Sequence, residues 1–334
     1  MNIRNHLWEA AHGKYERALP ILSFPAVQKM NVTVDQLVHD ARLQAEAMEI
    51  IVRETNSLAA ISLMDLSVEA EAFGAEIIFY ENEVPAVTGR LVSGEEEAAA
   101  LKVPPVNGGR TQLCIDAVRM AKERIVDRPV LAGMIGPYSL AGRLMDVTEI
   151  MFACYDDPDA VHMILDKATE FLIAYGRAFK DVGADGIMMA EPLAGVLSPD
   201  LMEEFSAPYV KRIIAALQDD AFGVIYHNCG NAVPHMLEAI FDQGAAAFHF
   251  GNAVDMAQVL ANAPADALCM GNIDPASQFV QGTPESIARA TAQLMEKCTA
   301  YPNFLLSSGC DIPAHAKWEN IRAFFGALNK HDKL

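Results

Sequence analysis

The residues best suited to chemistry in this sequence are one histidine and two cysteines. His227 and Cys229 lie two positions apart, where the apolar run "FGVIYH" gives way to "NCGN", and Cys310 lies far along the chain in "SSGCDIP". Residues two apart in an extended backbone point the same way, so His227 and Cys229 can bind one ion. One imidazole and two thiolates suit tetrahedral Zn²⁺, and three protein ligands leave a fourth position for a substrate. The pattern predicts a catalytic zinc site.

The surroundings of these residues add two expectations. A helix is expected to begin near Asn231 and to point its N-terminus at Cys229, which would favour the thiolate. The remaining cysteines lie in apolar patterns, where small buried thiols are common, and we interpret all of them as core residues: Cys114, Cys154, Cys269 and Cys298.

The elements that must position these side chains are indicated by eight apolar segments of strand length. They cover residues 19–24, 58–64, 129–135, 184–190, 222–227, 245–250, 267–273 and 303–308. Continuous apolarity is typical of parallel strands that are covered on both faces. Eight strands alternating with helices predict an α/β fold, a (β/α)8 TIM barrel formed by residues 1–334 as a single domain. The rival is a doubly wound sheet, but the glycine-rich nucleotide-binding motifs typical of that fold do not occur.

Helix signals separate the strands. Thr33 with Gln36 forms a capping-box pattern before residues 37–52, and glycines suited to helix stops stand at 183 and 244. Three capping side chains each precede a proline that suits the first helical turn: Asp157, Ser198 and Thr283. Residues 74–94 alternate and turn like a hairpin, which we interpret as a small insertion. The barrel is expected to carry an N-terminal helical extension.

Barrel enzymes work at the carboxyl ends of their strands, and several polar residues stand there. Glu191, in "MMAEPLAG", is interpreted as a fourth zinc ligand, a partner of a zinc ligand or a general acid–base group. Asp65, in "SLMDLSVEAEAFG", is similarly placed, and both are predicted to be catalytic. Three residues at other strand ends are predicted to bind the cofactor: Tyr138, Asn252 and Asp274. Of the remaining histidines, His249 is interpreted as structural, whereas two lie just past the metal loops: His235 and His315.

Composition narrows the range of partners. The chain of 334 residues has 44 acidic against 25 basic residues, a net charge of −19. This balance disfavours nucleic acid and anionic membranes, both of which reward clustered lysine and arginine. The apolar runs are shorter than the roughly 20 residues of a membrane helix, and charges interrupt the first residues where a signal peptide would be apolar. We therefore expect a cytoplasmic protein without a disulfide framework.

With these residues in view, the sequence resembles the uroporphyrinogen decarboxylase superfamily over nearly the whole chain. The segments that carry the resemblance, in the family's order, are "MDLSVEAEAFGAEI", "GMIGPYSLAGRL", "YHNCGN", "MGNIDP" and "SSGCDIPAHAKWENI". Within the superfamily, H-x-C…C resembles the zinc signature of the methylcobamide:thiol, or coenzyme M, methyltransferases. The resemblance implies a barrel with its site at the C-terminal face and His227, Cys229 and Cys310 as zinc ligands. Glu191 matches only an acidic position before proline.

The resemblance also implies an activity. A methyl group would pass from a methyl-Co(III) corrinoid, methylcobalamin or a similar cofactor, to a small thiol such as coenzyme M. Zinc lowers the pKa of the bound thiol, and cob(I)alamin is the other product. No corrinoid-binding D-x-H-x-x-G loop occurs in the chain, so the corrinoid is expected to arrive on a partner corrinoid protein. Barrels of this size often form homodimers, but no motif indicates one.

Other functions stay open at this point. The acceptor could be tetrahydrofolate, or the donor a methoxylated or methylated compound, with the corrinoid retained. The sequence disfavours a uroporphyrinogen decarboxylase, because those enzymes carry an arginine-rich R-Q-A-G-R-Y motif after the first strand. This chain has "ILSFPAVQKM" there, with no arginine and only Lys29, so bidentate contacts to substrate carboxylates would be missing. A catalytically silent binding subunit is opposed by the complete ligand set.

Overall fold

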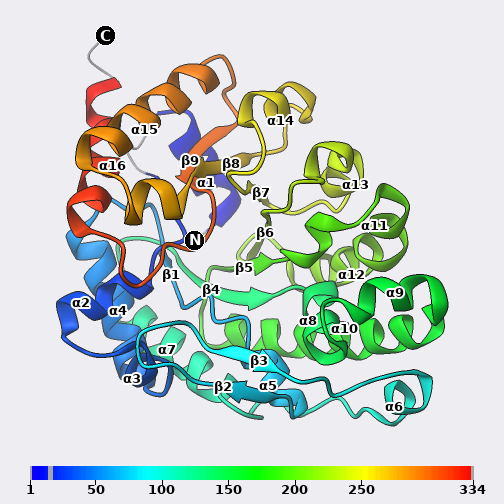
Figure 1. Cartoon of the computed structure of the whole chain (residues 1–334). Coiled ribbons are helices and arrows are strands. Elements are labelled where there is room, and N and C mark those ends of the chain that lie inside the picture. The colour runs from blue at the N-terminus through cyan, green and yellow to red at the C-terminus, as the bar shows by residue number, and fades with distance from the viewer. Residues whose placement is uncertain (1, 14–17, 332–334) are drawn as a thin grey trace.

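The computed structural model describes residues 2–13 and 18–331. Its centre is a curled sheet of parallel strands in the order β1-β4-β5-β6-β7-β8-β9, with helices around it (Figure 1). The strands are β1 (Ala60–Ile61), β4 (Val130–Ile135), β5 (Gly186–Ala190), β6 (Gly223–Asn228), β7 (Ala247–Phe250), β8 (Cys269–Ile273) and β9 (Phe304–Ser308). The predicted α/β class and parallel pairing are confirmed.

Both faces of this sheet are buried, which is why its strands are continuously apolar. Leu131, Met188 and Ile225, from three successive strands, pack together in an inner cluster. Ile187 directly precedes Met188, and Val224 directly precedes Ile225. Both belong to the outer cluster, beneath the helices. The alternation follows from the two-residue period of a strand.

The first predicted strand, residues 19–24, is not a strand, so the prediction of eight paired strands is wrong. The segment nevertheless lies between β9 and β1. The Leu19 N–H donates to the Leu306 carbonyl at 3.0 Å. On the other side, the Leu58 N–H donates to the Ala18 carbonyl at 2.8 Å. The sheet therefore has seven strands, with an irregular segment between its two edge strands.

Side chains of β9 explain why this segment does not pair as a strand. The hydroxyl of Ser307 donates to the Leu19 carbonyl at 2.7 Å. The Ile21 N–H donates to the hydroxyl of Ser308 at 3.0 Å. Pro20 between them has no N–H to donate. Hydroxyl groups thus take the places of backbone ladder partners, which a pattern of apolar residues does not reveal.

Helices surround the sheet, most of them on its outer side. They are α1 (Ile3–Ala11), α2 (Val27–Met30), α3 (Val34–Val38), α4 (Ala41–Glu54), α5 (Val68–Phe73), α6 (Glu95–Ala100), α7 (Thr111–Arg124), α8 (Pro137–Met145), α9 (Glu149–Asp156), α10 (Pro158–Asp181), α11 (Pro199–Phe205), α12 (Ala207–Leu217), α13 (Leu237–Phe241), α14 (Met256–Asn262), α15 (Pro284–Cys298) and α16 (Trp318–His331). Short turns of other helical types occur at Phe24–Ala26, Leu193–Val196, Val233–His235 and Pro275–Val280. Among the helices described, none has the length and apolar character needed to cross a membrane.

The helix starts predicted from capping side chains are confirmed. The side chain of Thr33 accepts from the Gln36 N–H in a capping box. The helix expected over 37–52 is divided, because Asp40 caps a second start at α4. The three capping residues before proline each accept a backbone N–H at the start of a helix: Asp157, Ser198 and Thr283.

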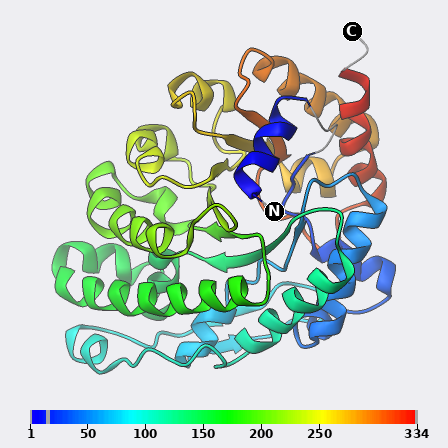
Figure 2. The ribbon, with the colours of Figure 1, turned by 180° about the vertical axis from the view of Figure 1, so that it is seen from behind.

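Two additions to the parallel sheet match the prediction. Strands β2 (Glu76–Ile78) and β3 (Ala86–Thr88) form the antiparallel hairpin of the expected insertion, below the sheet in Figure 1. Helix α1 is the expected N-terminal extension and lies across the back of the sheet (Figure 2). Its Ile3 and Leu7 are buried in the inner cluster. The extension therefore covers one end of the apolar interior.

Candidate metal centre

The structure brings together the three side chains singled out as metal ligands. His227 belongs to β6, Cys229 follows that strand directly, and Cys310 lies two residues after β9. One nitrogen of His227 and the two sulfurs all lie within 4.8 Å of one another. The Nε2 atom of His227 is 3.6 Å from the Cys310 sulfur. This convergence creates a possible metal site at the carboxyl ends of two parallel strands.

Glycines allow the loops around the three residues to approach closely. A Cβ atom at Gly251 would lie 2.5 Å from the Cβ of Cys229, a separation that side chains do not tolerate. A Cβ atom at Gly309 would lie 2.6 Å from the Asn252 side-chain oxygen. The loops after β6, β7 and β9 are therefore in direct contact, and the residue before Cys310 has to be small.

The two thiols influence each other's ionisation. Their mutual hydrogen bond lowers the pKa of Cys229, against the effect of burial. The same hydrogen bond, together with burial, raises the pKa of Cys310 to about 12. Cys229 is thus the thiol that loses its proton first. A dication between them would replace the shared proton.

The expected helix near Asn231 is wrong. The chain forms a short 3₁₀ turn, Val233–His235, followed by the five-residue helix α13. Pro234 lies in that turn, and neither element has the length of a helix with a strong dipole. The low pKa of Cys229 comes from its hydrogen bond to Cys310 instead.

Glu191 is fully buried beside the metal candidates, so its carboxyl group does not face solvent. Its backbone N–H donates to the His227 carbonyl at 2.8 Å. Its Oε1 atom accepts from the backbone N–H groups of Tyr138 and Ser139, at 2.9 and 3.2 Å, in the first turn of α8. Burial raises the pKa of Glu191 to about 8, against these hydrogen bonds. The group of three close ligand atoms does not include its carboxylate.

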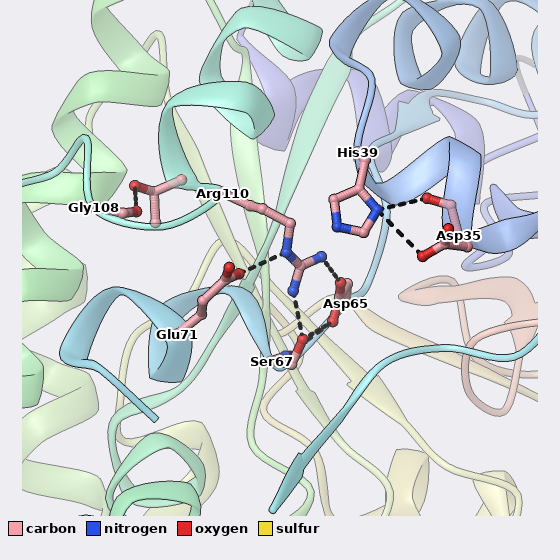
Figure 3. A network of polar contacts seen from close by, with 8 residues as sticks. Asp35, His39, Asp65, Ser67, Glu71, Gly108 and Arg110 are labelled. Carbon is pink, nitrogen blue, oxygen red and sulfur yellow. Dashed lines mark hydrogen bonds and ion pairs between the residues drawn. The ribbon is translucent and has the colours of Figure 1, made fainter. Parts of the chain in front are cut away.

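Asp65 is held by an arginine. Its Oδ2 atom accepts from the guanidinium of Arg110 at 2.5 Å, and its Oδ1 atom accepts from the hydroxyl of Ser67 at 2.6 Å. Arg110 also donates to Glu71 at 2.6 Å and to the Ser67 hydroxyl at 2.8 Å. Figure 3 shows the guanidinium between these three partners. The arginine thus connects the end of β1, the start of α5 and the loop before α7.

Glu69 lies behind this network in an enclosed cavity of about 10 Å³, just enough for one water molecule. Its Oε1 atom accepts from the Ile135 N–H at 3.0 Å. Its Oε2 atom is buried without a hydrogen-bond partner among the described residues. Burial raises the pKa of Glu69 from 4.5 to about 7.

This pKa predicts a pH dependence of stability. A carboxyl group with a raised native pKa binds its proton more tightly in the folded state, so its contribution to the free energy of unfolding declines as pH rises from about 4.5 to about 7. The decline amounts to roughly 3 kcal/mol. The variant Glu69→Gln should therefore gain stability relative to the wild type across this interval, as measured by urea unfolding at several pH values. Two pH profiles that run parallel would contradict this origin.

The remaining predicted residues lie apart from the three ligands or are engaged elsewhere. The ring of Tyr138 is fully buried and its hydroxyl lies 3.5 Å from the sulfurs of Met151 and Cys154, so its side chain is not available to a cofactor. Asp274 caps the following turn by accepting from two backbone N–H groups. Asn252 is exposed beside Gly309 and stays a predicted contact for a cofactor.

The other two histidines lie in surface hollows. His235 lines a hollow between α13 and α14. His315 lines a groove of about 500 Å³ with Gln28 and Asn82. Neither belongs to the group of close ligand atoms.

Sequence reasoning missed Arg110, the partner of Asp65. It could have been suspected because Asp65, Glu69 and Glu71 recur within a short apolar stretch, and buried carboxylates require a cation or a proton. His249 is a structural histidine, as expected, but its direct pairing with His227 across β6 and β7 was not foreseen. That register becomes visible only once the two strands are aligned.

Comparisons with known proteins agree with this fold. A methylcobamide:CoM methyltransferase MtbA from Methanosarcina acetivorans is 27% identical over 323 residues, covering 92% of this chain and 93% of that protein. A uroporphyrinogen decarboxylase from Neisseria meningitidis serogroup C is 29% identical over 283 residues, covering 81% and 78%. The solved structure of a methyltransferase from Methanosarcina mazei matches with a TM-score of 0.87 at 23% identity, covering 99% of both chains. The family model for uroporphyrinogen decarboxylase (URO-D) matches residues 17–331, and the chain belongs to that family.

Proposed function

We propose that this protein is a methyltransferase that moves a methyl group from a methyl-Co(III) corrinoid to a small thiol. The observation that carries the proposal is the convergence of His227, Cys229 and Cys310 within 4.8 Å. Relatives named methylcobamide:CoM methyltransferases, similar over most of the chain, support it. Coenzyme M is accordingly the first acceptor to test.

The three residues fit zinc. In a tetrahedral site with Zn–N of about 2.1 Å and Zn–S of about 2.3 Å, a nitrogen and a sulfur ligand are about 3.6 Å apart. The His227 Nε2 atom and the Cys310 sulfur have this separation, 3.6 Å. A soft, nitrogen–sulfur donor set selects zinc over magnesium or calcium. Zinc held there would supply the positive charge that keeps a thiol substrate deprotonated at neutral pH.

The reaction itself forms a sulfur–carbon bond and breaks a carbon–cobalt bond. The thiolate sulfur supplies the electron pair of the new bond, and the pair of the broken bond stays on the corrinoid as Co(I). The protein's own residues have to hold the thiol in line with the methyl group and exclude water from it. We propose that the corrinoid arrives on a partner protein at the carboxyl ends of the strands.

The fold supports this arrangement. We propose that residues 1–334 form one catalytic domain and that the segment 18–22 stands in for the eighth strand of a TIM barrel, since it is hydrogen-bonded to both β9 and Leu58 beside β1. We propose that the protein is cytoplasmic, and its six free cysteines suit a reducing compartment.

The two predicted catalytic carboxyl groups receive different roles. Glu191 remains the proposed acid–base group or additional ligand, because it neighbours His227 on the adjacent strand end. Asp65 is proposed to position the start of α5 through Arg110, because both of its oxygens are engaged.

Decarboxylation is the second candidate, because uroporphyrinogen decarboxylases are as similar in sequence as the methyltransferases. The structure offers little to bind a substrate with many carboxylates after the first segment. Lys29, the one basic residue there, is 3.7 Å from Glu54 and lies over the ring of Trp318 at 5.0 Å. Its charge is already compensated.

A spectroscopic assay tests the proposal. Zinc-loaded protein is incubated under anaerobic conditions with free methylcob(III)alamin and, in turn, coenzyme M, homocysteine or tetrahydrofolate, and the absorbance of cob(I)alamin is followed. We expect cob(I)alamin with at least one thiol. Turnover with tetrahydrofolate alone would replace the thiol by a folate acceptor. Demethylation with none of them, together with release of carbon dioxide from uroporphyrinogen, would overturn the proposal.

A further inference from the structure

A buried chain of hydrogen bonds leads from His227 to the irregular segment beside β9. The Nδ1 atom of His227 is 2.7 Å from the Nδ1 atom of His249, and the Nε2 atom of His249 is 2.6 Å from the hydroxyl of Ser307. That hydroxyl donates to the Leu19 carbonyl at 2.7 Å. Every residue in this series of hydrogen bonds is buried: His227 is 2% exposed, and His249, Ser307 and Leu19 are fully enclosed.

The last acceptor fixes the direction of every bond in the chain. A carbonyl oxygen only accepts, so Ser307 donates its one proton to Leu19 and must accept from the Nε2–H of His249. A neutral His249 then has a lone pair on Nδ1, which accepts from the Nδ1–H of His227. The Nε2 atom of His227 is left with its lone pair, and this is the atom that faces Cys310.

The surroundings of His249 agree with this direction. His249 is fully enclosed, and its two ring nitrogens face an imidazole and a hydroxyl group, neither of which carries a negative charge. A positive charge on His249 would be buried without compensation, so the imidazole is neutral. Two neutral imidazoles can share a short Nδ1···Nδ1 contact only when one donates and the other accepts.

We infer that His249 and Ser307 are positioning residues of the metal centre, which hold His227 in the tautomer and ring orientation that present Nε2 to a metal ion. The inference rests on the proposed metal site, because it assigns these residues a role only toward a metal ligand. Metal-binding histidines commonly donate their second N–H to such a partner, which fixes the tautomer and raises ligand basicity. Here the partner is a second histidine, His249. The hydrogen bond from Ser307 to the backbone carbonyl of Leu19 determines which ring nitrogen of His249 carries the proton.

Zinc affinity, measured by competition with a chromophoric chelator, tests the inference. His249→Leu removes the acceptor and should weaken zinc binding by about 10- to 100-fold. His249→Asn places an amide oxygen near the former Nδ1 position and should recover part of this loss. Ser307→Ala should weaken binding to a smaller extent. The matched control is Ser308→Ala, which removes the next hydroxyl on β9, bonded to Ile21 and not to a histidine, and should bind zinc like the wild type.

A second readout needs no substitution at these positions. In metal-free protein labelled with ¹⁵N-histidine, the His227 signals, assigned by their loss in His227→Ala, should show a proton on Nδ1 and none on Nε2. A proton on Nε2 in the wild type, or wild-type zinc affinity in folded His249→Leu, would overturn the inference. If zinc binding depends on His249 but the protein does not transfer methyl groups, the inference about His249 holds and the proposed function is wrong. If the protein transfers methyl groups but its zinc affinity does not depend on His249, the proposed function holds and the inference is wrong.

Discussion

Replacing Cys310 by alanine is expected to lower the affinity for zinc by more than about 100-fold, since even residues that only support a metal ligand typically contribute 10- to 100-fold. The sulfur of Cys310 is the donor brought to the other two from the far end of the sheet. Without it, His227 and Cys229 remain as an incomplete pair that cannot neutralise a dication. Chelator competition measures the affinity, and methyl transfer should be lost at limiting zinc.

The matched control is Cys269→Ala. Cys269 is a fully buried cysteine of the neighbouring strand β8, and its sulfur faces the Ala267 carbonyl at 3.6 Å. This variant should bind zinc as the wild type does, and Cys229→Ala should behave like Cys310→Ala. Full retention of zinc by either of the latter two would remove that residue from the ligand set.

The largest expected effect on stability comes from Arg110→Met. The Arg110 side chain is 7% exposed and its partner Asp65 is 3% exposed, so neither charge is well solvated. Removing one member of a buried ion pair leaves the other charge uncompensated and typically costs about 3–5 kcal/mol. Glu71 loses its partner too, although it is 24% exposed and can be reached by water. We expect the free energy of unfolding, measured in urea, to fall by about this amount.

A surface arginine provides the comparison. Arg119 pairs with Asp116 and Glu123 at 3.3 Å within α7, and its side chain is 44% exposed. Exposed pairs contribute about 0–1 kcal/mol, so Arg119→Met should change stability only slightly. Equal effects of the two substitutions would show that the Arg110 network adds nothing beyond a surface pair.

Much of the architecture follows from local sequence patterns. Seven of the eight apolar segments are strands, because burial on both faces requires continuous apolar residues, and the capping residues before proline start helices as expected. The remaining segment, residues 19–24, is not a strand, because strand formation depends on the partners that a segment finds in the fold. Its Leu19 and Ile21 bond to serine hydroxyls of β9, nearly 290 positions away in the chain.

The candidate site, like the fold, could be predicted only in part from local sequence. His227, Cys229 and Cys310 can be found from residue type and from their places at strand ends. The partners that hold them depend on register and packing, which no local pattern contains. Tyr138 shows the converse: it stands at a strand end, yet α9 covers its ring and makes it part of the core. Position at a strand end indicates which loop a residue belongs to, but not where its side chain points.

Membership of the URO-D family leaves two activities to choose between, because methyltransferases and decarboxylases are both similar to this chain. A fold shared by two chemistries cannot separate them, so the decision rests on side chains. The clustered nitrogen and sulfur donors favour methyl transfer to a thiol. The compensated Lys29, in place of an arginine cluster, disfavours a polycarboxylate substrate.

X-ray absorption at the zinc edge, recorded before and after addition of coenzyme M, tests most directly whether the centre binds a thiol substrate. The protein alone should show two sulfur ligands at about 2.3 Å and lighter donors at about 2.0–2.1 Å. With the thiol present, a third sulfur should appear at a similar distance. A spectrum that saturating thiol leaves unchanged would contradict the account.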